Sequence, residues 1–219
     1  MPSGNEGSPA PPSRAALSEG VLFTGTDPHP SRISLVLSTP EESRSGPMSP
    51  QLLRLRPLRP SDEAAALTAH RALEVDRFTF LLHYREREAW DDYLERLNGL
   101  RTGAHVPEGL VPDTFLAASV GDEIVGRVSV RHRLNDWLAL YGGHIGYGVV
   151  PPHRRKGYAT EMLRQALVVA RAAGIDDVLL VCDQSNVGSA RVIEACGGKF
   201  EQAIPGPDGR EPQRRYWIT

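Results

Sequence analysis

One short run of basic residues stands where a predicted strand passes into a predicted helix. A helix N-terminus offers unpaired backbone N–H groups and the positive end of the helix dipole, and glycine lets phosphate oxygens approach the backbone closely. Successive N–H groups in such a turn form a concave anion site, to which arginine and lysine add full charges. The run therefore predicts a pyrophosphate site, and it reads Arg154-Arg155-Lys156-Gly157-Tyr158-Ala159.

Two common nucleotide-binding patterns do not occur at this turn. The chain lacks GxxxxGK(S/T), and GxGxxG fails because Gly146 and Gly148 are followed by Pro151 where the third glycine belongs. The net charge of −2 indicates no general nucleic-acid surface, so any phosphate site must be local. The residues by themselves also leave open an ordinary solvated loop between strand and helix.

The surroundings of the turn narrow the choice of ligand. The turn fits the pattern R/Q-x-x-G-x-G/A, with Arg154, Gly157 and Ala159 at the key places. Val149-Val150-Pro151 precedes the turn, and a later helix opens at Asn186. In this combination the chain resembles the GNAT superfamily of N-acetyltransferases.

The resemblance covers about residues 52–219. Three further segments, residues 132–135, 142–148 and 215–218, are similar to an uncharacterised bacterial branch of the superfamily whose members are labelled predicted acetyltransferases. The resemblance implies an enzyme that transfers an acetyl group from acetyl-CoA to a primary amine by direct attack on the thioester. Two alternatives stay open, a larger acyl group and a non-catalytic acyl-CoA-binding sensor or interaction module.

The resemblance also implies a place for each part of acetyl-CoA, the expected co-substrate. Backbone groups of residues 147–150, among them Val149 and Val150, would line the pantetheine arm and hold the thioester. Asn186 and Ser189 would contact the pantetheine or the adenosine-side arm. Amides of the turn would bind the pyrophosphate, and the cofactor-binding residues expected there are Arg154, Arg155, Lys156, Gly157, Tyr158 and Ala159.

Catalysis requires a base for the amine and benefits from an acid for the leaving thiolate. Many family members place a tyrosine acid where this chain has Ile193, so the acid is missing, replaced from elsewhere or unnecessary. His144 is the first candidate base because imidazole titrates in the right range, and the alternative is a histidine that hydrogen-bonds a neighbouring strand. Tyr147 is second, since its hydroxyl could donate to the sulfur, and packing is its alternative role.

Cysteine and histidine spacing argues against other chemistries. Cys182 and Cys196 form no CxxC pair, which predicts neither a disulfide framework nor a zinc ribbon and fits a reducing cytoplasm. The seven histidines show no metal-ligand spacing, so we expect no metal. We expect as partners a small-molecule or peptide amine, no nucleic acid and no membrane, with a homodimer as a possibility.

The elements that must position these residues follow from hydrophobic periodicity and turn residues. They predict one α/β domain, for which the resemblance implies a mixed, mostly antiparallel central sheet with splayed strands and flanking helices. Ser61 is the expected cap of the first helix, and Asn98-Gly99 the expected end of the second, which carries Trp90 to Leu97. Strands are predicted at residues 52–58, 114–120, 124–130, 144–150, 177–182 (a buried parallel strand), 200–204 and 214–218, and helices at 61–73, about 90–99, 158–173 and 188–195.

The first part of the chain differs in composition from the rest. Residues 1–50 are rich in proline, serine and glycine, which predicts a disordered tail ahead of a domain at residues 51–219. We also consider that translation begins at Met48, just before the first regular element. The intact mass of the natively expressed protein tests this, and a mass that includes residues 1–47 would exclude it.

Overall fold

The structure is a computed structural model that describes residues 52–219. The predicted tail, at residues 1–50, and Met48 lie outside the described residues. In chain order the elements are β1 (Leu53–Arg56), α1 (Glu63–Glu74), α2 (Trp90–Thr102), β2 (Asp113–Val120), β3 (Glu123–Arg131), β4 (Ile145–Val149), α3 (Tyr158–Ala172), β5 (Val178–Asp183), α4 (Val187–Ala195), β6 (Lys199–Ile204) and β7 (Gln213–Ile218).

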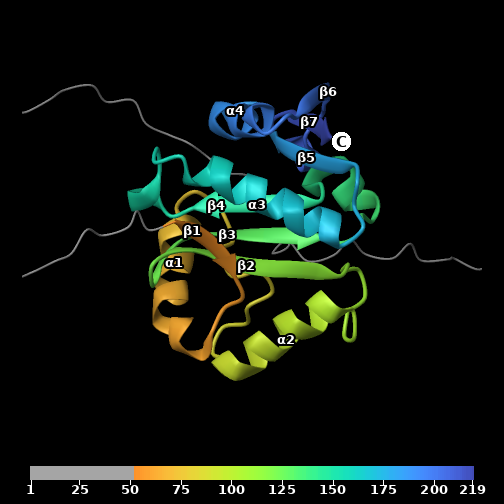
Figure 1. The fold of residues 1–219 in the computed structure, drawn as a ribbon. Helices are drawn as coiled ribbons and strands as arrows, with labels where there is room; N and C mark the ends of the chain where they lie inside the picture. The colour runs from red at the N-terminus through yellow and green to blue at the C-terminus, as the bar shows by residue number, and fades with distance from the viewer. Residues whose placement is uncertain (1–51) are drawn as a thin grey trace, which may run out of the picture.

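Two antiparallel sheets make up the centre of the fold. One has the strand order β1-β2-β3-β4 and the other β5-β7-β6. Helices α1 and α2 cover one face of the first sheet, while α3 covers the other and lies between it and α4 (Figure 1). The predicted α/β domain with splayed, mostly antiparallel strands is confirmed. The strand predicted at residues 177–182 is not in a parallel ladder, because β5 pairs antiparallel with β7.

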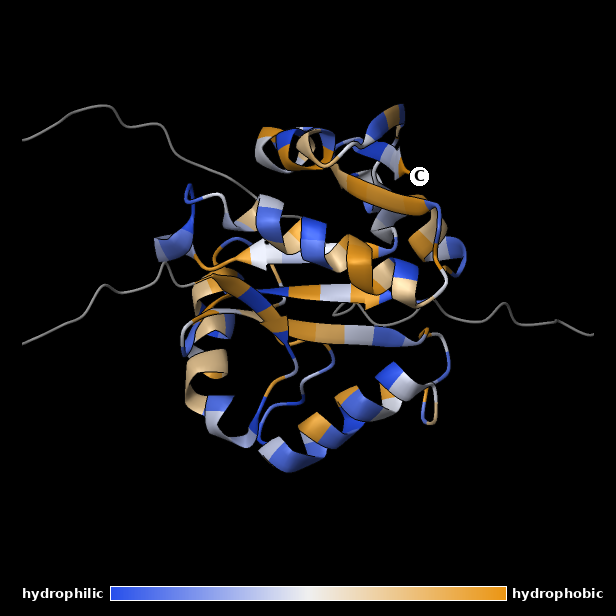
Figure 2. Cartoon of the chain, in the orientation of Figure 1, coloured by the Kyte–Doolittle hydropathy of each residue, from blue (hydrophilic) through white to orange (hydrophobic). Residues whose placement is uncertain are grey.

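Helix α3 packs through the apolar stripe that the sequence predicts. Its spacing of three and four residues places the apolar side chains on one face, which meets the sheet (Figure 2). Burying each larger side chain stabilises the fold by about 2 kcal/mol. The buried residues of this helix are Met162, Leu163, Ala166, Leu167 and Ala170.

Two predicted helix ends were wrong by a few residues. Ser61 does not cap α1, since residues 60–62 form a short 3-10 turn. Asp62 stabilises the turn that leads into α1 instead. Its carboxylate accepts hydrogen bonds from the Arg59 backbone N–H at 2.7 Å and from the Arg56 guanidinium. Helix α2 runs past Gly99, which is buried within it, and ends at Thr102.

The loop between α1 and α2, residues 75–89, packs directly on the first sheet. The ring of Phe78 lies so close to Gly148 of β4 that a Cβ there would be 2.5 Å from it. The Arg127 guanidinium of β3 lies 4.4 Å from the centre of the same ring and donates to the Thr79 carbonyl at 2.8 Å. The loop thus covers the face of the sheet that is opposite α3.

The two sheets meet where β4 begins. The His144 backbone N–H donates to the Leu179 carbonyl of β5 at 2.7 Å, and the Leu179 N–H donates to Nδ1 of His144 at 2.9 Å. Gly143 precedes this joint with φ 64° and ψ −173°, a conformation that is essentially restricted to glycine. A Cβ at Gly143 would lie 2.6 Å from the Leu179 carbonyl oxygen.

We expect Gly143→Ala to destabilise the protein by about 3 kcal/mol or more, because it adds a collision with Leu179 to an unfavourable backbone conformation. Gly109→Ala is the matched control, since Gly109 also has a positive φ but its Cβ would meet nothing within 4 Å. The control should cost about 1 kcal/mol. Urea unfolding of both variants measures the difference, and equal costs would show that the joint tolerates a side chain.

Candidate active site

The turn before α3 has the backbone of an anion site. Arg155 and Gly157 both adopt positive φ, of 63° and 80°. The first hydrogen bond of α3 runs from the Glu161 N–H to the Gly157 carbonyl, and no side chain caps the helix. The N–H groups of Tyr158 and Ala159, which precede that bond, therefore point out of the helix end. A Cβ on Gly157 would meet nothing within 4 Å, so the space beside it is open.

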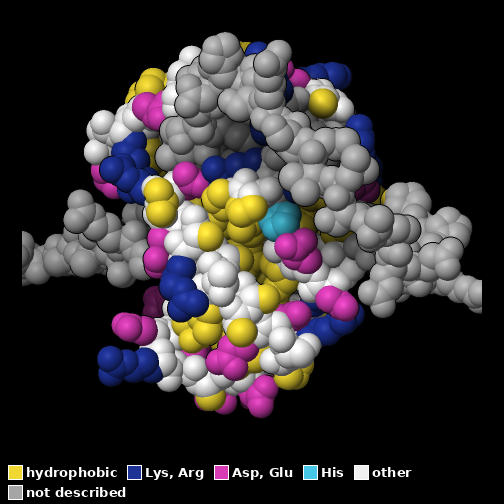
Figure 3. Space-filling view, turned by 90° about the vertical axis from the view of Figure 1, so that its left-hand side faces the viewer, with side chains coloured by type: hydrophobic (Ala, Val, Ile, Leu, Met, Phe, Trp, Pro, Cys, Tyr) yellow, Lys and Arg dark blue, Asp and Glu magenta, His cyan; other side chains and the backbone are white. Residues whose placement is uncertain are grey.

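A pocket of about 280 Å³ opens at this helix end. One wall is the turn and the start of α3, and the other is α4. Figure 3 shows this side of the molecule, with a hydrophobic patch near its centre and separate Lys and Arg side chains around it. The lining residues are Val149, His153, Arg154, Arg155, Gly157, Tyr158, Ala159, Thr160, Gly188, Arg191 and Val192.

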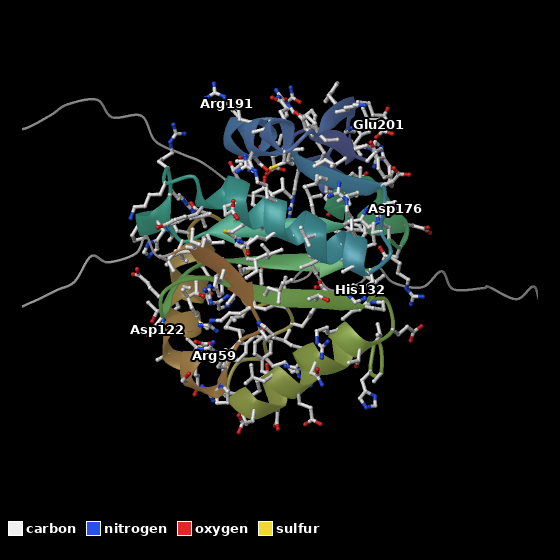
Figure 4. The ribbon with its side chains drawn as sticks, in the orientation of Figure 1. Arg59, Asp122, His132, Asp176, Arg191 and Glu201 are labelled. Carbon is white, nitrogen blue, oxygen red and sulfur yellow. The ribbon has the colours of Figure 1, made fainter. Side chains whose placement is uncertain are left out.

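The α4 wall contains residues that the sequence analysis missed. Gly188, Arg191 and Val192 follow one another at spacings of three and one, so they share a helix face that is turned toward the turn. Arg191 is labelled in Figure 4 and brings a second cation to the pocket that Arg155 already lines. The spacing was visible in the sequence, but only the packing of α4 against α3 shows that this helix face lines the same pocket as the turn. Lys156 is exposed and does not line the pocket.

Arg154 holds the turn in place. Its guanidinium forms an ion pair with Asp76, which follows α1, and its Nε donates to the Val149 carbonyl at 3.1 Å. Its side chain is largely buried in these contacts. Arg154 therefore fixes the turn against α1 and β4, and it also lines the pocket.

Beyond the joint at His144, β4 presents an open edge to β5. The Val150 N–H donates to the Val125 carbonyl of β3 at 2.9 Å. Because hydrogen-bonded and non-bonded pairs alternate in an antiparallel ladder, the N–H groups of Val149 and Tyr147 face away from β3. β4 is the last strand of its sheet, so these N–H groups point into the space between β4 and β5. This space is called the gap below. Of the two valines predicted to line the pantetheine, Val150 donates its N–H to β3, whereas Val149 turns its N–H away from β3.

Asn186 stands at the far side of this gap, at the start of α4. Its Oδ1 accepts the Ser189 N–H at 2.9 Å and so caps the helix. Its Nδ2 is buried and has no hydrogen-bond partner among the described residues. A buried donor left unpaired costs about 1–3 kcal/mol, so the site is incomplete without an acceptor. An amide carbonyl, such as those of a pantetheine arm, fits this requirement.

Tyr147 spans the gap from β4 to α4. Its hydroxyl lies 2.9 Å from the Ser189 hydroxyl, inside the fold. Burial raises the pKa of Tyr147 well above its usual value, so the phenol keeps its proton at neutral pH. Burial also raises the pKa of the nearby Cys182 thiol to about 12, which leaves no thiolate to act as a nucleophile.

The structure argues against His144 as the general base. Its Nδ1 lone pair accepts the Leu179 N–H, so the proton of the neutral ring is on Nε2 and neither nitrogen can accept another. Burial, followed by the charge of Arg131, lowers the pKa of His144. The residue takes the alternative role, that of a histidine that hydrogen-bonds a neighbouring strand.

Ile193, at the position where many family members have the tyrosine acid, belongs to the hydrophobic core. It is 1% exposed and packs against Gly198, where a Cβ would lie 2.4 Å from its Cγ2. Within residues 52–219, no group of three or more potential ligand side chains is placed to hold a metal ion. No helix in that range is long and apolar enough to cross a membrane.

A strand–helix turn with outward-pointing N–H groups, an open strand edge and an unpaired amide together suit an extended ligand that carries phosphate and amide groups. A family model for the acetyltransferase (GNAT) domain matches residues 53–199, and the chain belongs to this family. The protein is therefore an N-acetyltransferase whose co-substrate is acetyl-CoA. None of the curated proteins compared with the chain matches it.

Solved structures share the fold at low sequence identity. yncA from Salmonella typhimurium, with its cofactor acetyl-CoA, has a TM-score of 0.53 and 16% identity over 76% of this chain and 92% of that one. Mycobacterium smegmatis RimJ, in complex with CoA-disulfide, has a TM-score of 0.56 and 18% identity over 76% and 81%. RimL, a ribosomal L7/L12 alpha-N-protein acetyltransferase in complex with coenzyme A, has 0.54 and 17% over 78% and 96%.

We expect His144→Ala to cost about 1–3 kcal/mol, because it leaves the buried Leu179 N–H without an acceptor. His144→Asn, which restores an acceptor, should cost less and should keep acetyl transfer. The lowered pKa of His144 means that its contribution to stability is present above about pH 6.5 and is lost as the pH falls. The stability gap between wild type and His144→Asn should therefore shrink from pH 8 to pH 5.5.

Urea unfolding at the two pH values measures this gap, and thiol release from acetyl-CoA measures transfer. A folded His144→Asn protein with transfer reduced about 100-fold would restore His144 as a catalytic base.

Proposed function

We propose that this N-acetyltransferase acetylates a primary amine by direct attack of the amine on the thioester of acetyl-CoA. The observation that carries the proposal is the buried, unpaired Nδ2 of Asn186, which lies across the gap from the open edge of β4. An extended arm with amide groups can pair with both. The thioester at its end would then lie beside the outward-facing N–H groups of Tyr147 and Val149, which can stabilise the oxyanion of the tetrahedral intermediate.

The pyrophosphate of the co-substrate would bind at the other end of the gap. The N–H groups of residues 157–159 and the helix dipole of α3 supply the backbone part of this site. Arg155 and Arg191 supply charge from opposite walls of the pocket. These positions leave the acyl end of the molecule pointing toward the joint at His144.

Tyr147 is the proposed proton donor to the leaving sulfur. Its hydroxyl lies in the gap, its raised pKa keeps it protonated, and Ser189 holds its orientation. It comes from β4 rather than from α4, where many family members have their tyrosine. The hydroxyl would reach the sulfur from the strand side and fill the role that Ile193 cannot.

A second function is favoured by one observation. Ile193 is fully enclosed in the core, so α4 offers no acid at the usual position. A non-catalytic acyl-CoA sensor would need none. Tight binding of acetyl-CoA without turnover of any amine would support this alternative.

For the amine acceptor we propose only a chemical class. RimL acts on a protein α-amine by its name, and the same fold can serve small molecules, so a small-molecule or peptide amine is proposed here. A homodimer is a further proposal, which light scattering of the purified protein tests. Cytoplasmic location is likewise a proposal, which fractionation of the native cells tests.

The function is tested by thiol release from acetyl-CoA with lysine, spermidine, ethanolamine and a peptide with a free N-terminus. We expect at least one amine to accelerate release. Gly157→Glu is the control, because its carboxylate would occupy the open space of the pyrophosphate site and should abolish acetyl-CoA binding in calorimetry. Unchanged affinity in that variant would remove the basis for placing the co-substrate at the turn.

We expect Tyr147→Phe to lower kcat by about 10–100-fold while acetyl-CoA affinity stays within about threefold, since only the proton donor is lost. Tyr216→Phe is the matched control. Its hydroxyl also contacts α4, at Glu194, but lies on β7 outside the gap. Equal kcat values for Tyr147→Phe and wild type would exclude Tyr147 as the acid.

A further inference from the structure

The second sheet ends in a strand with an open edge. In the order β5-β7-β6, β5 borders the gap and β6 lies at the opposite, outer edge (Figure 1). Among residues 52–219, β7 is the one strand that pairs with β6. Residues 199–203 of β6 are all exposed, so side chains on both of its faces are accessible. An open edge carries unpaired N–H and C=O groups that can pair with another strand.

The other outer edge of the fold is covered. β1 is the first strand of its sheet, and the Gln165 side chain of α3 lies along its free edge. The Leu55 N–H donates to Oε1 of Gln165 at 3.0 Å, and Nε2 of Gln165 donates to the Leu53 carbonyl at 2.9 Å. A side chain thus takes the hydrogen bonds that a further strand would form. Within the described part of the chain, β6 has no such cover.

The start of β6 places two opposite charges on one face of the sheet. Lys199 lies opposite Trp217 of β7. Glu201, labelled in Figure 4, accepts at Oε2 a hydrogen bond from Nε of Arg215 at 2.6 Å. Because the two β7 residues are two positions apart in one strand, their side chains share a face. Lys199 and Glu201 therefore lie on that same face.

Phe200 lies on the opposite face, beside α4. It pairs with Tyr216 of β7, and the centres of the two rings are 5.6 Å apart. The Tyr216 hydroxyl donates to Glu194 of α4, which identifies the face. Phe200 is nevertheless 57% exposed. Pairing of β6 with another chain would cover this ring as well as the open backbone.

We propose that β6 pairs with β6 of a second copy of this chain, antiparallel and about a two-fold axis at Phe200. In this register Lys199 of one copy lies opposite Glu201 of the other, and the symmetry forms this oppositely charged pair twice. The two Phe200 rings lie opposite each other. An axis at Lys199 or at Glu201 would instead place like charges opposite each other, which is unfavourable.

Two further features define the extent of this interface. The Glu201 side chain is 34% exposed although it bonds Arg215, so a second cation can reach its carboxylate. The β6–β7 pairing shifts register between Phe200 and Gln202, and such a bulge bends the strand and interrupts regular pairing. The contact is therefore confined to residues 198–202, and we expect a small, reversible interface.

The interface goes beyond the proposed function and does not rest on it. None of residues 198–202 lines the co-substrate pocket, and β6 is separated from the gap by β7 and β5. Acetyl-CoA binding should therefore not depend on the pairing of two copies.

The test is sedimentation equilibrium of the full chain from about 1 µM to about 1 mM, the range expected of a small, transient interface. Wild type should form a reversible dimer. Lys199→Glu and Glu201→Lys should each weaken self-association about tenfold or more, because each places like charges opposite each other twice. An equimolar mixture of the two variants should associate to within about threefold of wild type, since the reversed charges then face each other.

Arg54→Glu is the matched control for these charge reversals. Arg54 is exposed on β1, the outer strand whose edge Gln165 covers. This variant should associate as wild type does.

A disulfide provides a second measurement that does not depend on charge. Directly opposed residues of antiparallel strands have Cα atoms about 5 Å apart, which a disulfide can span. The variants carry Cys196→Ala, which removes the partly exposed native thiol. Under mild oxidation Phe200→Cys should form a covalent dimer. Ala203→Cys is the control, because it lies on the same exposed strand but opposite residue 197 rather than its own copy.

A wild-type chain that stays monomeric up to about 1 mM, or charge variants that fail to associate when mixed, would overturn the interface. Equal cross-linking at residues 200 and 203 would overturn the register. Thiol release from acetyl-CoA is measured in parallel. Loss of the dimer in a variant with full transfer supports the interface and leaves the proposed function intact. A wild-type dimer that releases no thiol with any amine overturns the proposed function alone.

Discussion

The site depends on a single joint between two sheets. His144 holds Leu179 with both its backbone and its imidazole, and Gly143 lets the chain pass close enough for both bonds to form. Beyond this point β4 and β5 diverge, so backbone N–H groups that would complete a sheet face a gap instead. Unpaired polar groups are costly inside a protein, and the gap is therefore a site for a ligand that carries hydrogen-bonding groups along its length.

The two ends of this gap differ in charge. At the end next to the turn, the α3 helix terminus, Arg155 and Arg191 create a positive region that suits a pyrophosphate. The ion pair of Arg154 with Asp76 holds the turn in place. At the end next to His144 the side chains are neutral, and the hydroxyls of Tyr147 and Ser189 share a hydrogen bond. A molecule that is charged at one end and carries a neutral thioester at the other fits this gradient.

The face of the first sheet opposite α3 has an unusual interior. Arg127 is fully buried under the ring of Phe78, and burial lowers its pKa to about 10. Asp113 lies on the same face of the sheet with one oxygen unpaired. Buried charges of this kind are expensive, and they are found where a protein moves protons or recognises charged groups.

The sequence predicted the local features well. The helix of α3, the strands β2 and β3, the position of the turn before α3 and the start of α4 near Asn186 depend on neighbours within a few residues. Periodicity and turn residues report such features directly. The ends of the helices were predicted less accurately. Ser61 and Gly99 are residue types that often start or end a helix, but the actual ends were decided by Asp62 and by packing of α2 on the sheet. The roles of single polar residues were least predictable.

The sequence by itself determined the order of elements, the place of the turn before α3 and the family to which the chain belongs. Only the tertiary structure decided which polar residues are available for chemistry. His144, Asp113 and Ser129 have residue types that suit proton transfer, but their partners lie 16 to 35 residues away. Such partners are set by strand register and by the divergence of two sheets, and no pattern of neighbours along the chain encodes them.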